Sequence, residues 1–349
     1  MRKVHSLLSL AFVVTLVIAV PLSANSQTVT PFDPTGSTST FPASINPAGA
    51  ITGFYSDASF VNHGFLRGAD GTITTFDPSG STSTMPAGIN PEGDIVGSYT
   101  DANAVSHGFL RTEDGTITSF DAPGAGTGLF QGTNATSINP AGTITGYYAD
   151  ASYANHGFVR AADGSFTKFD VGSQGTFPTN ISSAGEITGN YLFELGTSGF
   201  YVPRGFLRAA NGTITVNIDP ANTFTSNPGG INPNGTIAGY YQDDIAGAWH
   251  FFLRSKGGVL TTFDVPGTRQ IFSATLNQGQ TVIGTYPDAS FVIHSFLRTA
   301  HGAVTAIDAP DAGTSFFQGT FVSGINSAGM ITGHYTDMNY AAHGFVWGK

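Results

Sequence analysis

The sequence predicts an all-β fold made of seven copies of one short unit. The first copy runs from Ile45 to Asp77, and later copies align with its His63-Gly64-Phe65 tripeptide at intervals of 44, 49, 48, 46, 44 and 49 residues. Within each copy, residue types alternate over short runs bounded by Gly, Pro, Asn and Asp, which is typical of strands and turns. Four such runs per copy, repeated every 45 residues or so, are typical of propeller blades (about 45 residues each). We therefore expect a seven-bladed β-propeller of four-stranded antiparallel blades.

The four strands of the first copy can be placed directly. They are expected just before Asn46 and over the runs ITGFY, HGFLR and TITTFD that follow it. Between the second and third strands we expect a five-residue loop from Ala58 to Asn62. The cross-strand pairs that this loop predicts are Asp57 with His63, Tyr55 with Phe65, and Gly53 with Arg67. We interpret the glycine as room for the arginine side chain to lie across the sheet.

The two ends of the chain are expected to build one blade together. The segment TVTPFD at 28–33 matches the fourth strand TITTFD, and the last copy stops at HGFVWGK, 343–349, which supplies a third strand. We therefore expect the N-terminal strand to complete the last blade, which closes the ring without an open sheet edge.

Residues 1–26 differ from the repeats. Arg2 and Lys3 precede an apolar run from Leu7 to Val20, and small residues follow, a pattern that predicts a secretory signal peptide. The apolar run is short for a membrane span, and no other segment is long and apolar enough to cross a bilayer. We expect residues 27–349 to form one propeller domain that is secreted to the extracellular space or the periplasm.

Composition excludes several classes of site and partner. The chain has no cysteine, so no disulfide, thiolate metal site or cysteine nucleophile is available. Removing Arg2 and Lys3 from the 13 basic residues leaves 11 against 23 acidic ones. Six of these 11 are arginines at one recurrent position, so no basic patch remains, and nucleic acid and anionic membranes are disfavoured as partners. The six are Arg67, Arg111, Arg160, Arg208, Arg254 and Arg298.

An aspartate and a histidine stand six residues apart in six copies. We interpret each pair as a structural hydrogen bond at the mouth of the middle hairpin, because a general acid or base is not needed six times. In the fourth copy both residues change together, to Glu194 and Arg204, which suggests direct contact. The six pairs are Asp57/His63, Asp101/His107, Asp150/His156, Asp244/His250, Asp288/His294 and Asp337/His343.

The tandem Ile-Asn-x-x-Gly, Gly-x-Tyr and His-Gly-Phe arrangement resembles a repeat family of exported bacterial proteins that is named for its His-Ala-Phe (HAF) tripeptide. The resemblance covers residues 28–347, with departures at Arg204-Gly205-Phe206, His250-Phe251-Phe252 and His294-Ser295-Phe296. It implies an extracellular location and a propeller-like fold. It brings no catalytic residues that could be carried over to this chain.

Aromatic residues in the variable loops make sugar binding the first candidate chemistry. Rings in an uncharged setting rich in Ser, Thr and Asn suit stacking on the apolar face of a sugar. The alternative is that these rings pack onto the adjacent blade. The candidates are Phe60, Tyr153, Phe291 and Tyr340, each three residues after a recurrent aspartate, with Tyr201 in the enlarged fourth loop and Trp249 near the same rim.

Metal binding and hydrolysis are weaker candidates. An aspartate ends each fourth strand, but none shows the dense spacing of a calcium loop, and Asp is ordinary in turns. Glutamate is scarce, whereas glycoside cleavage needs two carboxylates at a fixed separation. His334 lies at the variable site of Gly-x-Tyr, which could line the channel. We therefore predict no catalytic residue, no metal site and no cofactor.

The crossovers between blades vary most in length. Those from Asp121 to Ile138 and from Asp308 to Ile325 are the long ones, and they resemble each other in sequence. In propellers they share a face with the loops between second and third strands, and loops on a rigid scaffold commonly carry function. We expect an exported, non-enzymatic binding module for glycans or a surface protein. The alternatives are a hydrolase or lyase that acts on polysaccharide through this face, and a self-associating envelope component.

Overall fold

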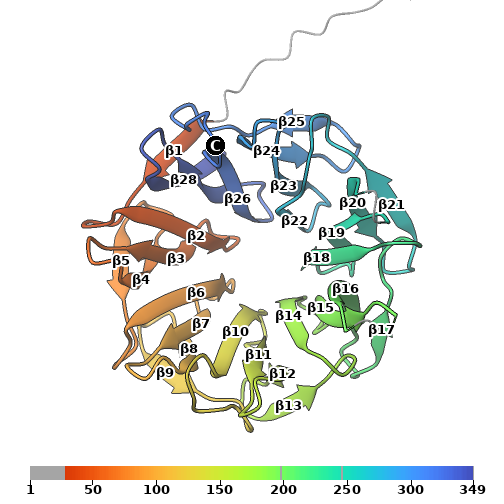
Figure 1. The fold of residues 1–349 in the computed structure, drawn as a ribbon. Coiled ribbons are helices and arrows are strands. Elements are labelled where there is room, and N and C mark those ends of the chain that lie inside the picture. Colours follow the sequence, from red (N-terminus) through yellow and green to blue (C-terminus); the bar gives the residue numbers. More distant parts are fainter. Residues whose placement is uncertain (1–27, 197–198, 245–246, 349) are drawn as a thin grey trace, which may run out of the picture.

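The computed structural model describes residues 28–196, 199–244 and 247–348, and this part of the chain forms a ring of seven four-stranded antiparallel blades (Figure 1). The fold class predicted from the repeats is therefore confirmed. The predicted signal peptide, residues 1–26, lies outside the described residues. The described part of the chain contains no helix that is long and apolar enough to cross a membrane.

Each blade runs from an innermost strand at the channel to an outermost strand at the rim. The first blade is β2 (Ser39–Ile45), β3 (Ile51–Ser56), β4 (Asn62–Arg67) and β5 (Ile73–Phe76); the second is β6 (Ser83–Ile89), β7 (Ile95–Thr100), β8 (Ser106–Arg111) and β9 (Ile117–Phe120). The third is β10 (Gly132–Ile138), β11 (Ile144–Ala149), β12 (Asn155–Arg160) and β13 (Phe166–Phe169); the fourth is β14 (Thr176–Ile181), β15 (Ile187–Glu194), β16 (Tyr201–Arg208) and β17 (Ile214–Val216); the fifth is β18 (Thr225–Ile231), β19 (Ile237–Gln242), β20 (Trp249–Arg254) and β21 (Leu260–Phe263). The sixth is β22 (Ser273–Leu276), β23 (Val282–Pro287), β24 (Ile293–Arg298) and β25 (Val304–Ala306); the seventh is β26 (Gly319–Ile325), β27 (Ile331–Thr336), β28 (Ala342–Gly348) and β1 (Thr28–Phe32).

The ring closes where the two ends of the chain meet. Strand β1 pairs antiparallel with β28, with Val29 opposite Trp347 and Pro31 opposite Phe345. Figure 1 shows β1, coloured red, beside the blue strands of the seventh blade. The prediction that the N-terminal strand completes the last blade is confirmed.

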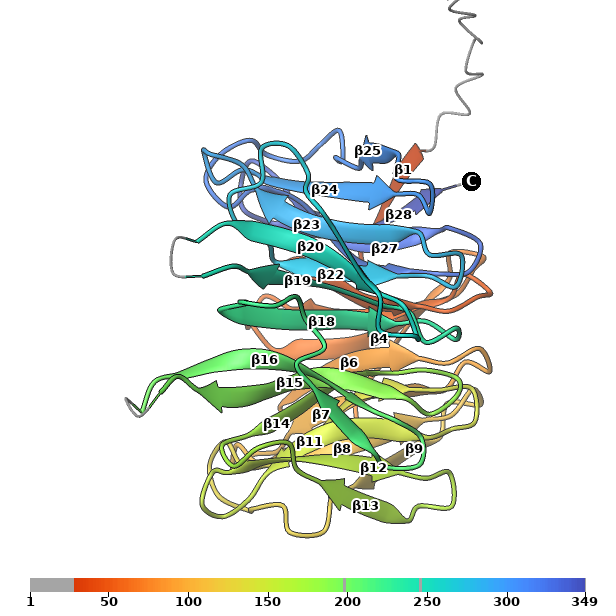
Figure 2. The ribbon, with the colours of Figure 1, turned by 90° about the vertical axis from the view of Figure 1, so that its right-hand side faces the viewer.

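The ring has two faces with different connections (Figure 2). We call the face that carries the loops between second and third strands, together with the crossovers between blades, the loop face. The other face carries the remaining turns, and we call it the turn face. Strands β15 and β16 of the fourth blade project farthest from the loop face, at the left of Figure 2.

Neighbouring blades are joined by a repeated contact between rings and an arginine. Phe32, on the outermost strand of the seventh blade, packs edge-on against the buried Phe65 of the first blade, with ring centres 5.9 Å apart. The Arg67 guanidinium lies 5.0 Å from the centre of the same Phe32 ring. At five junctions one blade therefore presents a ring that the next blade covers, and the buried Ile218 and Ile307 take the place of the ring in the fourth and sixth blades. The same contact joins Arg111 to Phe76, Arg160 to Phe120, Arg208 to Phe169, and Arg298 to Phe263.

The cross-strand register differs by two residues from the predicted one. Gly53 lies opposite Phe65, and Tyr55 lies opposite His63. The loop is 57–61 because Asp57 accepts hydrogen bonds from the backbone N–H groups of Ser59 and Val61, which fixes the turn. A Cβ on Gly53 would clash with the Phe41 carbonyl oxygen. The glycine therefore admits the neighbouring bulged strand, and the interpretation that it makes room for Arg67 is wrong.

Buried asparagines link the blades at the start of the first turn. The side-chain amide of Asn46 donates to the Asn90 carbonyl of the next blade, at 3.2 Å. Asn326 of the seventh blade donates to the Asn46 carbonyl at 3.1 Å, across the ring closure. Because a buried amide without a partner is costly, these bonds explain why the Ile-Asn pair recurs. Asn139, Asn232 and Asn277 make the corresponding bond to the following blade.

Asp33 reinforces the ring closure on the loop face. One carboxylate oxygen of Asp33 lies 2.8 Å from His343 Nδ1 in the seventh blade. The other accepts a hydrogen bond from the Thr40 hydroxyl in the first blade. The side chain thus joins β1 to its own blade and also to the next one.

We predict that Asp33→Ala destabilises the protein by about 1–2 kcal/mol, because two hydrogen bonds to a carboxylate are lost at the closure. Urea unfolding at pH 7 measures the change. The matched control is Asp264→Ala, because Asp264 bonds His250 but no side chain of the next blade among the described residues. Equal losses in the two variants would show that the bond between blades contributes nothing.

Candidate functional site

Histidines on the loop face each lie between two aspartates. In the first blade, His63 Nδ1 is 2.7 Å from Asp77, which ends the fourth strand, and Nε2 is 3.6 Å from Asp57. The predicted Asp–His contact is thus the longer of two. The nearer partner is the aspartate that ends the fourth strand, which was interpreted from the sequence only as ordinary turn chemistry. The same arrangement occurs at His107, His156, His294 and His343, with Nδ1 at 2.8–3.0 Å and Nε2 at 3.2–3.8 Å.

The predicted structural role of these clusters agrees with their geometry. The Asp77 hydrogen bond raises the pKa of His63. Backbone N–H donation from Val61, followed by Ser59, lowers the pKa of Asp57 and keeps it ionised. The two carboxylates approach opposite edges of the imidazole, so they do not converge on one point. Within the described residues, no group of three or more His, Asp or Glu side chains could hold a metal ion.

Two predicted pairs are wrong in detail. In the fifth blade the loop between β19 and β20 is one residue longer than its counterparts, so Asp243, not Asp244, faces His250, at 3.5 Å. Asp243 also accepts the Ala248 N–H, the role that Asp57 has in the first blade. In the fourth blade Arg204 pairs with Asp219 at 3.3 Å. Glu194 lies opposite Tyr201 in the ladder, beyond the position of Arg204.

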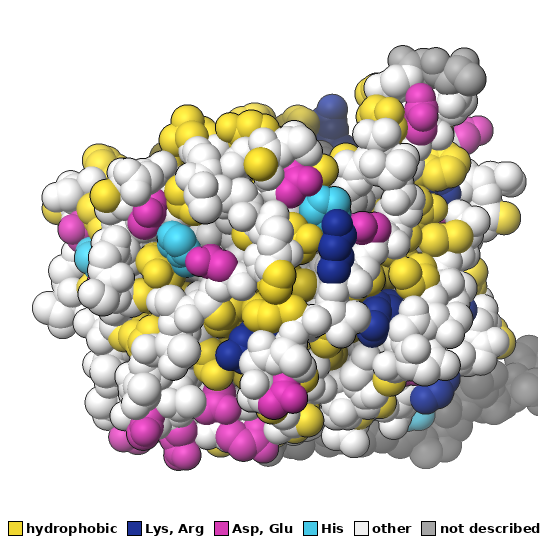
Figure 3. Space-filling model, turned by 90° about the horizontal axis from the view of Figure 1, so that it is seen from below, with side chains coloured by type: hydrophobic (Ala, Val, Ile, Leu, Met, Phe, Trp, Pro, Cys, Tyr) yellow, Lys and Arg dark blue, Asp and Glu magenta, His cyan; other side chains and the backbone are white. Residues whose placement is uncertain are grey.

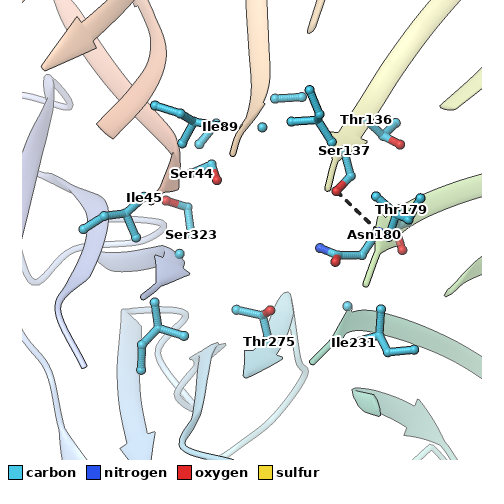
Figure 4. Close-up of a pocket in the computed structure, with 18 of the residues that line it drawn as sticks. Ser44, Ile45, Ile89, Thr136, Ser137, Thr179, Asn180, Ile231, Thr275 and Ser323 are labelled. Atoms are coloured by element: carbon cyan, nitrogen blue, oxygen red, sulfur yellow. Dashed lines mark hydrogen bonds between the residues drawn. The ribbon is translucent and has the colours of Figure 1, made fainter. Parts of the chain in front are cut away.

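The central channel holds a cavity of about 280 Å³ (Figure 4). Its lining combines isoleucines with small polar side chains, and it contains no ionisable residue. Ser137 accepts a hydrogen bond from the Ile181 N–H across the gap between two blades. Acid–base chemistry therefore has no protein group to perform it in this cavity. The labelled polar side chains in Figure 4 are Ser44, Thr136, Ser137, Thr179, Asn180, Thr275 and Ser323.

His334 joins two blades and is not among the residues that line this cavity. Its ring stacks on Phe321 of the same blade, with centres 4.6 Å apart, and meets Phe41 of the first blade edge-on at 5.0 Å. Burial lowers the pKa of His334 to about 4, so the ring is neutral at physiological pH. The corresponding pair in the first blade is Phe54 stacked on Phe41.

A larger pocket, of about 600 Å³, lies on the loop face of the seventh blade. The crossover that follows Asp308 forms one wall, and the loop between β27 and β28 forms the other. Its volume is in the range of small-molecule sites, and polar side chains dominate its lining. The lining residues that carry polar side chains are Asp311, Thr314, Ser315, Gln318, Tyr335, Asp337, Asn339 and His343.

The polar groups of this pocket differ in how far they are already engaged. Burial opposes ionisation of Asp337, but N–H groups of Ala341 and Asn339 donate to it and lower its pKa overall. Burial, reinforced by the charge of Asp311, raises the pKa of Tyr335 and keeps its phenol protonated. Asp311 is exposed and makes no hydrogen bond or ion pair among the described residues. Its carboxylate is therefore free to accept hydrogen bonds from a ligand.

Aromatic rings border the pocket on the side of the sixth blade. We call Phe272, Phe291, Phe316 and Phe317 the aromatic platform. Phe317 lies nearly parallel to Phe272 and Phe291, with ring centres 6.1 and 6.0 Å away. Phe316 is 56% exposed and packs edge-on against Phe317 at 4.6 Å. The Tyr340 hydroxyl donates to the Phe316 carbonyl, so the platform is continuous with the pocket.

Several of these rings stand on strained backbone. Phe291, Phe317 and Tyr340 have φ angles of 61°, 58° and 65°, in the left-handed region. Bulky side chains rarely adopt this conformation, which costs about 1–2 kcal/mol, and glycine or asparagine would occupy the position more cheaply. The loops require the backbone conformation, but they do not require a ring. Phe317 and Tyr340 are exposed and Phe291 is half-buried, so the first two present rings that a ligand can reach.

The corresponding region at the second and third blades is a natural comparison. Its long crossover has the same construction, because Gly128 N–H donates to Gln131 as Ser315 N–H donates to Gln318. Phe130 N–H bonds the Ala104 carbonyl as Phe317 N–H bonds the Phe291 carbonyl. Positions that differ are therefore not dictated by the scaffold. Asp311, Ser315, Phe316 and Phe291 of the seventh-blade region correspond to Gly124, Gly128, Leu129 and Ala104.

This comparison identifies residues that the repeat pattern missed. Asp311 and Phe316 were not candidates from the sequence, although aligning the two long crossovers would have revealed them. Of the predicted aromatic residues, Phe291 and Tyr340 lie together at the platform. Phe60 is 86% exposed on the first blade, and Tyr153 is exposed on the third. Trp249 packs on Tyr240 and the fifth-blade core, and Tyr201 is half-buried in β16.

The charged groups of the loop face lie just behind its apolar edge. Figure 3 views the outer wall of the ring, with the loop face along the upper edge. Hydrophobic side chains protrude along that edge, and histidine and acidic side chains lie just below it. The loop face thus combines rings with hydrogen-bonding groups.

Comparisons with known proteins identify the fold. The chain is similar to the β-propeller domain of the Trilobed protease from Pyrococcus furiosus, with a TM-score of 0.62, 10% identity, and coverage of 88% of this chain and 95% of that one. It is also similar to virginiamycin B lyase from Staphylococcus aureus, with a TM-score of 0.58, 16% identity, and coverage of 91% of this chain and 98% of that one. The BP39L lectin from Burkholderia pseudomallei gives a TM-score of 0.51 at 9% identity, with coverage of 90% of this chain and 98% of that one. At such identities the likeness shows the β-propeller fold alone. No family model matches the chain, and no curated protein matches its sequence.

The structure predicts a pH-dependent effect of His334→Phe. The folded-state pKa of about 4 lies below the ordinary 6.5, so the unfolded chain binds more protons and stability falls as the pH drops through this window. Phenylalanine copies Phe54 of the first blade and does not titrate, so the variant does not lose this stability at low pH. The free energy of unfolding of the variant minus that of the wild type should be larger at pH 5 than at pH 8, by up to about 2 kcal/mol. Urea unfolding at both pH values measures it, and a difference independent of pH would contradict the assignment.

Proposed function

We propose that the chain is an exported, non-enzymatic module that binds neutral glycans in the seventh-blade pocket. The observation that carries this proposal is the pocket of about 600 Å³ with a free carboxylate, hydroxyls and amides on its walls and exposed rings at its border. Sugars need both kinds of contact, because their hydroxyls form hydrogen bonds while one face of the ring is apolar. The signal peptide predicted for residues 1–26 and the resemblance to the HAF repeats support export.

The charge of the pocket supports a neutral ligand. Asp311 and Asp337 are the acidic residues of its lining, and the lining contains no lysine or arginine. An acidic sugar would meet like charge in this pocket, which is unfavourable. A neutral sugar can donate hydrogen bonds from its hydroxyl groups to the carboxylates.

Binding is favoured over hydrolysis or elimination by the state of the ionisable groups. His343 Nδ1 is held by Asp33 at 2.8 Å, and its Nε2 faces Asp337 at 3.8 Å. This arrangement recurs in other blades, where it has a structural role. Asp337 is held ionised by backbone N–H groups, so it is poorly suited to donate a proton. The pocket therefore offers recognition groups and lacks a dedicated acid–base pair.

We predict that Asp311→Ala reduces glycan affinity by about tenfold or more, because hydrogen bonds to a charged group are lost. The purified protein is first screened on a glycan array, and calorimetric titration then compares wild type and variant on each neutral sugar bound. The melting temperature should not change, since Asp311 has no partner among the described residues. Tyr153→Ala on the third blade is the control and should bind as the wild type does.

Binding that is unaffected by Asp311→Ala would show that the glycan site lies outside the seventh-blade pocket. The absence of any glycan ligand on the array would reject the proposed function and favour a protein partner on the same face.

A further inference from the structure

The aromatic platform extends the pocket in one direction. Tyr340 and Phe316 stand at the border of the pocket, and Phe317, Phe291 and Phe272 continue from them toward the sixth blade. Phe272 and Phe317 are within 11° of parallel, and Phe291 and Phe317 within 26°. Phe272 and Phe291 are half-buried and support Phe317, so the platform rings that a ligand can reach are Phe316 and Phe317, beside Tyr340. A single sugar held in the pocket could not cover these rings as well.

We propose that the platform binds the continuation of an extended, neutral, β-linked glycan chain whose end or branch occupies the seventh-blade pocket. This inference rests on the proposed function. Extended β-linked chains present flat, repeating apolar faces, and successive rings of the platform match such faces. The loop face would thus recognise chain length as well as sugar identity.

The second and third blades show that the scaffold does not require aromatic rings at two positions of the platform, those of Phe291 and Phe316. Ala104 occupies the position of Phe291 with nearly the same backbone, φ 58° against 61°. Leu129 occupies the position of Phe316 in a crossover with the same hydrogen bonds. The fold therefore accepts small or aliphatic residues at both places, and the seventh-blade region carries aromatic rings despite the strain of the left-handed backbone.

Arg269 fixes one ring of the platform. Its guanidinium carbon lies 4.4 Å from the centre of the Phe291 ring, and Nη1 donates to the Ala289 carbonyl. Arg269 lies in the crossover between the fifth and sixth blades, whereas the recurrent arginines stand at the ends of third strands. The contact orders Phe291 before a ligand arrives, which reduces the entropy lost on binding.

The test is a chain-length series. Glucose and N-acetylglucosamine oligosaccharides with β-1,4 links, from monomer to hexamer, are titrated into the wild-type protein and into the double variant Phe291→Ala/Phe316→Leu. Phe291→Ala copies Ala104 of the second blade and Phe316→Leu copies Leu129 of the crossover to the third blade, so the variant should fold, and its melting curve verifies this. For the wild type, affinity should rise about tenfold or more between monomer and hexamer. For the double variant, affinity should be nearly independent of length.

A second variant separates the two proposals. Asp311→Ala should weaken binding at every chain length, while the length dependence remains. If the double variant keeps the full length dependence, the platform is not a subsite, although an Asp311-dependent affinity would leave the pocket standing. If the wild type binds neither series, the inference of an extended β-linked chain is overturned, and the array result on Asp311 decides the proposed function separately.

Discussion

The structure depends on the contact between the outermost phenylalanine of one blade and the arginine and phenylalanine of the next. Phe32, Phe65 and Arg67 form this contact across the ring closure, and equivalents recur around the ring. A ring of blades has no single core, so stability must come from each junction between neighbours. The repeated residues of the chain are largely those that make the junctions. Aspartates and asparagines add directional bonds that fix how one blade sits on the next.

This constraint explains why repetition conceals the candidate site. A residue that recurs from blade to blade serves the scaffold, as Asp77 does by bonding His63 of its own blade and Thr84 of the next. A residue that differs between otherwise equivalent positions is not required by the scaffold. Asp311 and Phe316 differ from Gly124 and Leu129 on crossovers with the same internal hydrogen bonds. Function is therefore sought in departures from the repeat, and Asp311 and Phe316 are two departures at the pocket of the seventh blade.

The sequence predicted the fold well because period and alternation report directly on blades and strands. The closure by β1 followed from a match between TVTPFD and TITTFD. The register failed because Asp57 belongs to the loop, where it binds backbone N–H groups, and residue spacing does not reveal this. Asp244 failed for a related reason, since one added loop residue moves the contact to Asp243. The pocket could not be predicted, because its two walls meet only in three dimensions, while Phe291 and Tyr340 could be proposed from their loops.

The most direct test of the central claim is a crystal structure of the protein with a neutral oligosaccharide that it binds in solution. Our account predicts one sugar in the seventh-blade pocket with a hydroxyl bonded to Asp311, and further units over Phe316 and Phe317. Sugar bound instead in the central channel or on the third blade, with the seventh-blade pocket empty, would contradict it.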